Sequence, residues 1–300
     1  MTLLHTLLNP ILPVFAIVVI GYALGRSGHT TVEQARALNR LALTLLLPIL
    51  LFGLIVKAPL DEFEAKPILA YAGVEVVVFA LGYILARYVF RRPLAEAILL
   101  AMAGIFSNTV LYVLPLSLIL YGPDNILPVT EIVTLDSTLT FAAFIIAMEI
   151  FAKTRTDLGG TLIRIAKTPL LIAMASGLAI NLAGFALPAP LETFIDFNGG
   201  AAAPVALFSL GVVLSQAPLT PSPTVYTFTF IKLAVFPLAI WLGLLAAAPG
   251  ASQQYILGSA GPAGAMAFSL ALLYGVRTDA IAKVIIYSSV LTLFTLAALA

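Results

Sequence analysis

Three ionisable side chains lie inside long apolar stretches of this sequence, where a charge is costly. They are Glu75, Asp136 and Lys232. An acid or a lysine at the centre of a lipid-embedded helix costs about 2.5–3.5 kcal/mol on insertion scales, so each needs a reason to be there. Glu75 has no lysine or arginine within one helical turn, and a desolvated acid of this kind can carry a proton. We therefore treat the three residues as candidates for binding a coupling ion, H+ or Na+.

Each of these three side chains could instead have a structural role without binding an ion. Glu75 could be a neutral, hydrogen-bonded acid, and Asp136 could lie shallow enough to be hydrated. Lys232 could extend its ammonium group to the cytoplasmic interface. Near the end of the same stretch as Asp136, Glu149 and Lys153 are spaced i,i+4, which predicts a salt bridge at the end of a helix.

Two other apolar stretches carry helix-breaking residues near their middles, and they lie half the chain apart when the Tyr-Gly pairs that end them are aligned. The residues that we assign to these breaks are Ser107, Asn108, Thr109 and Pro115 in the first, and Pro262, Ala263 and Gly264 in the second. Lipid cannot satisfy backbone groups that proline and glycine free, so such backbone must face protein or a wet cavity. Paired interrupted segments in corresponding halves are typical of the binding sites of transporters.

The chemistry of these interruptions favours an anion. Each break leaves the N-terminus of a half-helix near the middle of the bilayer, where N–H groups and the positive dipole end attract negative charge. The Asn108 amide and the Thr109 hydroxyl add directed donors. We expect the seven residues of the two breaks to bind a carboxylate without a buried arginine. The alternative is a proline kink in which Asn108 bonds a neighbouring helix.

The composition places the whole chain in a membrane. Of its 300 residues, 61% are hydrophobic and 10% are charged, whereas soluble domains carry roughly 25% charged residues. The absence of cysteine excludes disulfides and thiolate chemistry. The only histidines, His5 and His29, fall at or beyond opposite ends of the first span. We therefore expect no catalytic residues, no metal site and no cofactor, and no basic run predicts nucleic-acid binding.

A helical span needs about 20 mostly apolar residues, and this rule predicts ten spans. Their approximate limits are Leu7–Leu24, Leu38–Val56, Ile68–Val89, Ala95–Tyr121, Thr130–Phe151, Pro169–Leu187, Leu191–Leu214, Val225–Ala247, Gln254–Tyr274 and Ala280–Leu299. Lys and Arg alternate between successive loops, and the richer loops include Arg87, Arg91 and Arg92. Because such loops stay in the cytoplasm, we predict a multi-pass protein of the cell membrane with both termini outside.

The two halves of the chain resemble each other. Pro48 to Val56 matches Pro204 to Val212 in proline, leucine, phenylalanine and valine positions, and Lys232 falls one residue from the equivalent of Glu75. Five spans per half is an odd number, so residues 1–155 and 156–300 would form two repeats of inverted topology. Chance similarity among apolar sequences is the alternative. The predicted fold is an all-α membrane protein of ten helices in two inverted five-helix repeats, with broken helices four and nine.

Several of these motifs, in this order and spacing, resemble the auxin efflux carrier family, which includes plant carriers and bacterial organic-acid transporters. They are Leu38-Asn39-Arg40 leading to Pro48, Asn108-Thr109, Pro115-Leu116, Tyr121-Gly122, Ala206 to Gly211, and Pro262 to Tyr274. The resemblance implies that helices 1, 2, 6 and 7 form a dimeric scaffold and that helices 3–5 and 8–10 form a mobile domain. It also implies that the broken helices cross and that substrate binds beside the crossing in an elevator-like cycle.

The sequence departs from the plant carriers at some of these positions. Ser107 stands where they usually have proline, and Ala263 replaces a polar residue. Glu75 looks like their third-helix acid, but Phe79 occupies the place of its lysine partner, and Asp136 replaces a glutamine. The loop from residue 152 to 167 is short. These differences point away from auxin itself and towards cation coupling.

Together, these features predict a secondary transporter of small organic anions, auxin-like or malonate-like carboxylates included, in which Glu75 carries a proton. One alternative is a sodium-coupled symporter of the bile-acid type. A membrane ligand sensor without transport is another, although the chain carries no evident signalling domain. The expected partners are the anion, the lipid bilayer and a second copy of the chain.

Overall fold

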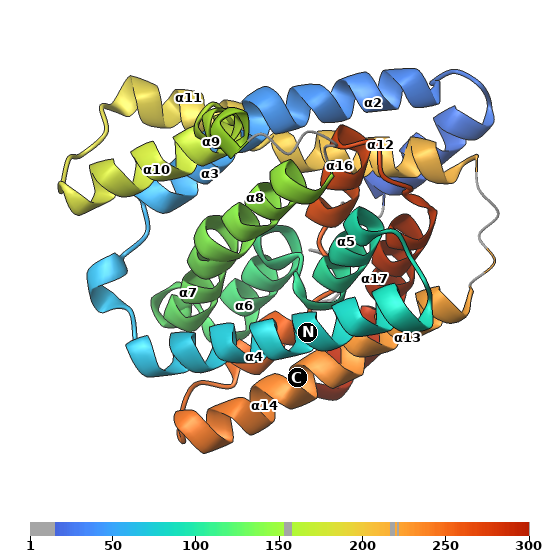
Figure 1. The fold of residues 1–300 in the computed structure, drawn as a ribbon. Coiled ribbons are helices and arrows are strands. Elements are labelled where there is room, and N and C mark those ends of the chain that lie inside the picture. The colour runs from blue at the N-terminus through green and yellow to red at the C-terminus, as the bar shows by residue number, and fades with distance from the viewer. Residues whose placement is uncertain (1–15, 153–157, 217–219, 221, 300) are drawn as a thin grey trace.

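Long apolar helices dominate the computed structural model, which describes residues 16–152, 158–216, 220 and 222–299 (Figure 1). Five of its helices are long and apolar enough to cross a membrane: Val32–Val56, Ala65–Val89, Leu127–Phe151, Ala189–Leu214 and Pro223–Ala247. They correspond to predicted spans two, three, five, seven and eight. The expectation of an all-α membrane protein is thereby confirmed, whereas the ten-helix inverted repeat stays a prediction.

The first half consists of the helix Ala16–Arg26 and a series of elements that continue from it. In chain order these are α2 (Val32–Leu41), η1 (Ala42–Leu46), α3 (Leu47–Val56), η2 (Leu60–Glu62), α4 (Ala65–Ile84), η3 (Leu85–Val89), α5 (Leu94–Ile105), η4 (Thr109–Val113), α6 (Leu114–Tyr121), η5 (Pro123–Asn125), α7 (Leu127–Leu135), η6 (Asp136–Thr140) and α8 (Phe141–Phe151). His5 and the start of the predicted first span lie outside the described residues.

The second half has a similar series of helices. They are α9 (Leu158–Ala166), α10 (Pro169–Leu182), α11 (Ala189–Gly199), α12 (Ala202–Leu214), α13 (Pro223–Phe230), η7 (Ile231–Val235), α14 (Phe236–Ala247), α15 (Gln254–Ala260), α16 (Met266–Leu273) and α17 (Asp279–Leu299). The expectation that residues 152–167 form only a loop is wrong, because Leu158–Ala166 form the helix α9. Its Leu162 and Ile163 are exposed, as in a helix that lies at a membrane interface.

Local sequence explains where several helices begin and bend. Thr31 and Gln34 form a reciprocal capping box at the start of α2, which satisfies two backbone donors that the first turn leaves free. The elements η1, η3, η4, η6 and η7 are π-helical turns, which are often found at functional sites. Asp136 opens η6 and Lys232 lies in η7, so two of the ionisable candidates occupy widened turns.

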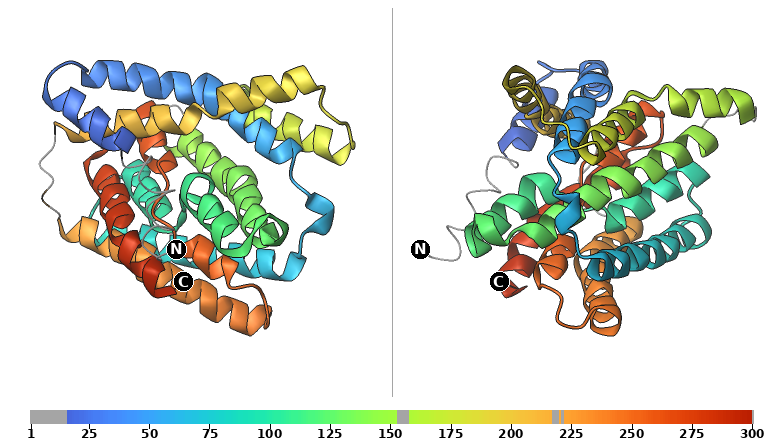
Figure 2. Two further views of the ribbon diagram at one scale, coloured as in Figure 1. Left: turned by 180° about the vertical axis from the view of Figure 1, so that it is seen from behind. Right: turned by 90° about the vertical axis from the view of Figure 1, so that its left-hand side faces the viewer.

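The helices divide into two groups that lie side by side (Figure 2). In both views, α2, α3, α10, α11 and α12 run along one side, and α4 to α8 with α13 to α17 occupy the other. Within the first group α3 packs against α10 and α11, and α2 packs against α12. The backbones approach closely because Gly177 has no side chain: a Cβ there would lie 3.1 Å from the carbonyl oxygen of Phe52.

Candidate functional site

The two interruptions meet and pair their backbones. The α5 helix ends at Ile105, and the chain then runs in a non-helical segment to Asn108. Ser107 and Ala263 form an antiparallel bridge. The Asn108 N–H donates to the carbonyl oxygen of Pro262 at 2.8 Å, and the Gly264 N–H donates to the carbonyl oxygen of Phe106 at 2.8 Å. The breaks thus satisfy each other's backbone polar groups, which lipid could not do.

The first break does not have the cause that the sequence suggested. Pro115 lies in α6, beyond the π-helical turn η4, whereas the break is at residues 106–108. The i→i+5 pattern of η4 lets the chain carry a proline without a second interruption. The expectation that Pro115 breaks this helix is therefore wrong. In the second segment the expectation fits, because Pro262 lies between the end of α15 and the start of α16.

Three ionisable residues come together next to these paired breaks, which we call the crossing. They are Glu75, Asp136 and Lys232. They belong to α4, η6 and η7, and their exposed fractions are 4%, 3% and 0%. The Nζ atom of Lys232 donates to the Ser107 hydroxyl at 2.7 Å and to the Ser259 carbonyl oxygen at 2.6 Å. The alternative in which Lys232 reaches the interface is therefore wrong. Its ammonium instead ties the first break to the helix that leads into the second.

The two acids are buried next to each other. Thr140 donates its hydroxyl to Glu75 Oε2 at 3.0 Å, and the carboxyl groups of Glu75 and Asp136 lie within hydrogen-bonding distance of each other. The hydration alternative for Asp136 does not fit this burial. Coulombic interactions connect Lys232 to both acids, and Asp136 interacts with Thr109. One buried cation thus faces two buried acids.

A small cavity of about 70 Å³ lies between the crossing and the first helix group. Ser107, Asn108, Thr109, Gly264 and Asp136 line it from the crossing side. The opposite wall comes from α3 and α12, through Leu50, Leu54, Ala206 and Leu207. Most of the predicted binding residues therefore surround one space, together with one of the predicted ion-binding acids.

The predicted residues do not all play the same part there. Asn108 also lines a second cavity of about 340 Å³, with Tyr22, Leu207 and Ser289. The hydroxyl of Thr109 is buried and interacts with the carboxyl group of Asp136. Ala263 is buried, and its N–H donates to the Ser288 hydroxyl at 3.0 Å. Asn108 and Thr109 are therefore the break residues best placed to offer side-chain donors to a ligand.

The contacts of two buried polar residues, Glu131 and Asn39, were missed at the level of sequence. Glu131 in α7 accepts hydrogen bonds from the Tyr255 hydroxyl and from the Glu64 N–H. Asn39 Nδ2 donates to the carbonyl oxygen of Ser269 at 3.0 Å and so connects α2 to α16. An acid inside predicted span five could have drawn attention to Glu131, whereas the motif Leu38-Asn39-Arg40 includes Asn39 but gives no sign of this contact.

Lys153 lies outside the described residues, so the salt bridge predicted between Glu149 and Lys153 stays a prediction. Glu149 itself accepts a hydrogen bond from the Tyr274 hydroxyl at 2.8 Å. The acid thus connects α8 to the end of the second broken segment. Among the described residues, no group of three or more His, Asp or Glu side chains could hold a metal ion.

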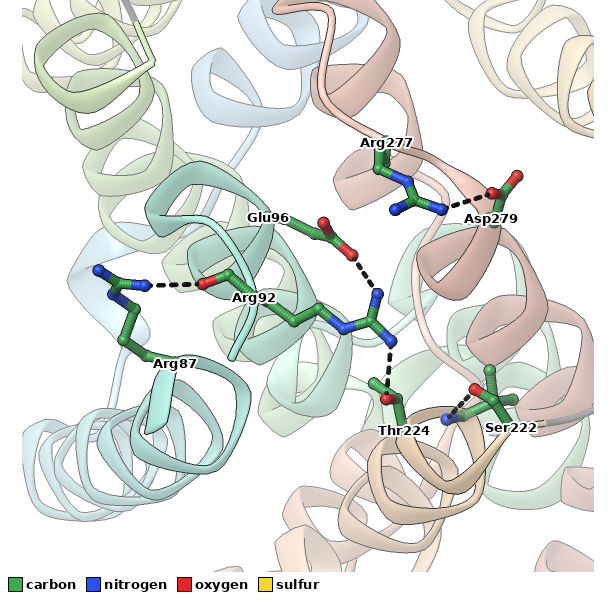
Figure 3. A network of polar contacts seen from close by, with 8 residues as sticks. Arg87, Arg92, Glu96, Ser222, Thr224, Arg277 and Asp279 are labelled. Carbon is green, nitrogen blue, oxygen red and sulfur yellow. Dashed lines mark hydrogen bonds and ion pairs between the residues drawn. The ribbon is translucent and has the colours of Figure 1, made fainter. Parts of the chain in front are cut away.

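Basic loop residues gather at one end of the helices (Figure 3). Arg92 donates to Glu96 at 3.2 Å and to the Thr224 hydroxyl at 3.0 Å, and Arg277 pairs with Asp279 at 3.6 Å. Arg92, Glu96, Arg277 and Asp279 line a polar cavity where α5, α13 and α17 begin. The loops after predicted spans three and nine therefore lie at the same end of the helices, as the alternation of charge predicts.

Comparison with known proteins gives a consistent result. Residues 6–300 match the family described as membrane transport protein. A protein of Rhizobium meliloti (strain 1021) named "Putative malonate transporter" is 30% identical over 96% of this chain and 93% of its own length. A protein of Escherichia coli (strain K12) named "Uncharacterized transporter YfdV" is 26% identical over 78% of this chain and 77% of its own length. The chain therefore belongs to the membrane transport protein family, which is the family of the auxin efflux carriers, and it is a membrane transporter and not an enzyme.

Proposed function

We propose that this chain is a secondary carrier of small organic anions and that the anion binds beside Asn108 at the crossing. The observation that carries the proposal is the cavity shared by Asn108, Thr109 and Gly264, which lies between the two helix groups. The helical turns that start at Thr109 and Met266 begin at this crossing. Their N-termini favour negative charge, and the Asn108 amide adds a neutral donor. Short dicarboxylates of the malonate type are the first substrates to test, since a relative bears that name.

Asp136 supports coupling of the anion to a cation. Its carboxyl group lines the same cavity as Asn108, and two negative charges so close together in a low dielectric repel each other strongly. A proton on the cluster of Asp136 and Glu75 would remove that repulsion. Sodium is the alternative, because the buried oxygens of Asp136 and Thr109 are ligands that a hard cation prefers.

The two helix groups support an elevator mechanism. The helix Ala16–Arg26 with α2, α3, α10, α11 and α12 would form a fixed scaffold, through which two copies of the chain would dimerise. The remaining spanning helices would carry the crossing and its cavity across the membrane. The cavity lies where the moving and fixed groups would slide past each other, which suits alternating exposure of a bound ligand.

Replacing Asn108 tests the binding site. In proteoliposomes, Asn108→Ala should lower uptake of the transported carboxylate roughly ten- to a hundredfold, since a hydrogen bond to a charged group contributes about 1.5–3 kcal/mol. Asn125→Ala is the matched control, because the side chain of the exposed Asn125 bonds only the nearby Tyr121 carbonyl oxygen among the described residues. Unchanged uptake by a folded Asn108→Ala protein would rule out the proposed site.

Two further measurements separate the alternatives. Uptake driven by a proton gradient in potassium buffer supports proton coupling, while uptake that requires sodium supports the symporter alternative. Carboxylate binding that shifts the thermal stability of the protein, without any flux in proteoliposomes, would instead identify a sensor. A panel of mono- and dicarboxylates should be screened first by thermal shift, with and without sodium.

A further inference from the structure

Another cavity lies directly beside the proposed anion site, between the two helix groups. Its volume is about 310 Å³, and its walls come from α3 and α11 on one side and from α6 and α7 on the other. Leu50, Leu54 and Val133 line both this cavity and the cavity beside Asn108. Leu50 and Leu54 are only partly buried, so rotation of their side chains, which is much faster than movement of helices, can connect the two spaces. We refer to the cavity of 310 Å³ as the entrance cavity.

The mouth of the entrance cavity lies at the end of the molecule opposite the basic loops. Lys57 and Asp196 line it and form an ion pair at 2.8 Å, and their side chains are 43% and 66% exposed. Lys57 directly follows α3, and the spanning helix made of α4 and η3 then crosses to the end where Arg92 lies (Figure 1). Water and small ions therefore reach the entrance cavity from the side that the alternation of charge predicts to be outside.

Towards the basic loops, the two helix groups are in contact. The α16 helix starts at the crossing and runs towards Arg277, and α2 of the first group packs against it. At this contact Asn39 Nδ2 donates to the carbonyl oxygen of Ser269 at 3.0 Å, and the two residues are 1% and 0% exposed. A ligand beside Asn108 that left in this direction would have to part α2 from α16.

The contact between Asn39 and Ser269 uses only part of the hydrogen-bonding capacity of the two residues. Asn39 Oδ1 and the Ser269 hydroxyl are buried and have no hydrogen-bond partner among the described residues. A buried polar atom without a partner is costly, whereas water would satisfy it once the contact opens. The single hydrogen bond therefore favours the closed arrangement, while the two unused groups lower the cost of opening it. Such a contact can be broken and made again in every transport cycle.

We propose that Asn39 is a latch: its hydrogen bond to Ser269 keeps the anion site accessible from the entrance cavity, and its release opens the site towards the basic loops. The proposal rests on the proposed function, because it names the residue that controls access to the proposed anion site. Asn39 does not line the cavity beside Asn108. It is therefore a positioning residue, which acts on the arrangement of the helix groups and does not touch the anion.

Cysteine accessibility tests the latch, because the chain has no native cysteine. Thr134→Cys reports on the entrance cavity, which Thr134 lines, and Asp61→Cys, in the exposed loop before α4, marks the entrance side. Ser269→Cys reports on the closed side and keeps the backbone carbonyl oxygen that Asn39 binds. Each full-length protein is reconstituted in vesicles, and its reaction with a membrane-impermeant methanethiosulfonate is timed from each side without substrate. We expect Thr134→Cys to react from the same side as Asp61→Cys, and Ser269→Cys to react slowly from the opposite side.

Removing the latch should expose the closed side alone. Loss of one hydrogen bond shifts the equilibrium between the two arrangements roughly two- to tenfold, so Asn39→Ala should speed the reaction of Ser269→Cys by that factor without speeding that of Thr134→Cys. Asn198→Ala is the matched control, because the Asn198 amide also donates to a backbone carbonyl oxygen, but within α11. If Asn39→Ala does not fold, Asn39→Leu replaces it, since leucine keeps the size of the side chain and lacks the donor.

Three outcomes would overturn the proposal. The first is an unchanged rate for Ser269→Cys in the Asn39 variant. The second is an equal increase for Ser269→Cys and Thr134→Cys, which would indicate a general loosening of the fold. The third is a reaction of Thr134→Cys from the side opposite to Asp61→Cys. Because no substrate is present, these rates test the latch whether or not the chain carries organic anions, which the uptake by Asn108→Ala tests separately.

Discussion

At the scale of single residues, Lys232 is the residue on which the crossing depends most. Its ammonium group is fully buried and donates to Ser107 in the first break and to Ser259 in the helix before the second. It also interacts electrostatically with Glu75 and Asp136. Removing one partner from a buried set of charges costs about 3–5 kcal/mol, because the remaining groups lose their compensation.

Lys232→Met should therefore lower the melting temperature of the detergent-solubilised protein and abolish transport. The double variant Lys232→Met with Asp136→Asn should recover part of the lost stability, because it also removes a buried acid. Lys66→Met, at an exposed position of α4, serves as the control and should melt like the wild type. A double variant that is no more stable than Lys232→Met alone would argue against charge compensation in the cluster.

Glu75→Gln tests proton coupling at the same scale. If the anion enters together with a proton, uptake by the wild type rises as the external pH falls. The amide cannot bind that proton, so we expect the pH profile of uptake to become flat. Glu33→Gln, in the exposed first turn of α2, is the control. A Glu75→Gln protein with the wild-type pH profile would exclude Glu75 as the coupling group.

At the scale of elements, the paired breaks form one unit. The bridge between Ser107 and Ala263 needs the two backbones in contact, and this contact depends on Gly264. A Cβ atom there would lie 2.9 Å from Cδ1 of Phe106 and 3.1 Å from the carbonyl oxygen of Ser107. The π-helical turn after the first break then returns the chain to a regular helix that contains Pro115.

Gly264→Ala should consequently separate the breaks slightly and reduce transport, and we expect a loss of about 1–3 kcal/mol in stability, as for other overpacked sites. Gly73→Ala is the matched control, because a Cβ at Gly73 meets no atom within 4 Å and alanine is the better helix former. Thermal melting and proteoliposome uptake measure the two effects. Equal behaviour of the two variants would show that close backbone approach at Gly264 is not required.

At the scale of the whole molecule, the proposed mechanism requires the two helix groups to move relative to each other. Leu54 of α3 packs against a cluster that includes Val133 of α7, across the boundary between the groups. Asn39 and Ser269 make a hydrogen bond across the same boundary, and it would have to break during the movement. Within the first group, a Cβ atom added at Gly177 would lie 3.3 Å from Cβ of Ile55.

The chain has no cysteine, so engineered disulfides can test this movement without interference from native thiols. The pair Leu54→Cys and Val133→Cys should stop transport when oxidised or joined by a short bifunctional reagent, and cleavage of the link should restore it. The pair Ile55→Cys and Gly177→Cys lies within one group and should leave transport active when linked. Full transport by the first pair in its linked form would contradict relative movement of the two groups.

The sequence by itself determined that this is a multi-pass helical membrane protein, because apolar runs of spanning length can be read directly. The limits of spans such as Thr130–Phe151 differ from those of the structure by only a few residues. It also identified Glu75, Asp136, Lys232 and Asn108, because polar groups stand out within apolar surroundings. Only the tertiary structure showed that the counter-charge of Glu75 comes from η7 and not from its own helix. The site of the first break and the contact between the two breaks were likewise decided in three dimensions, because both depend on hydrogen bonds between segments more than 150 residues apart in the chain.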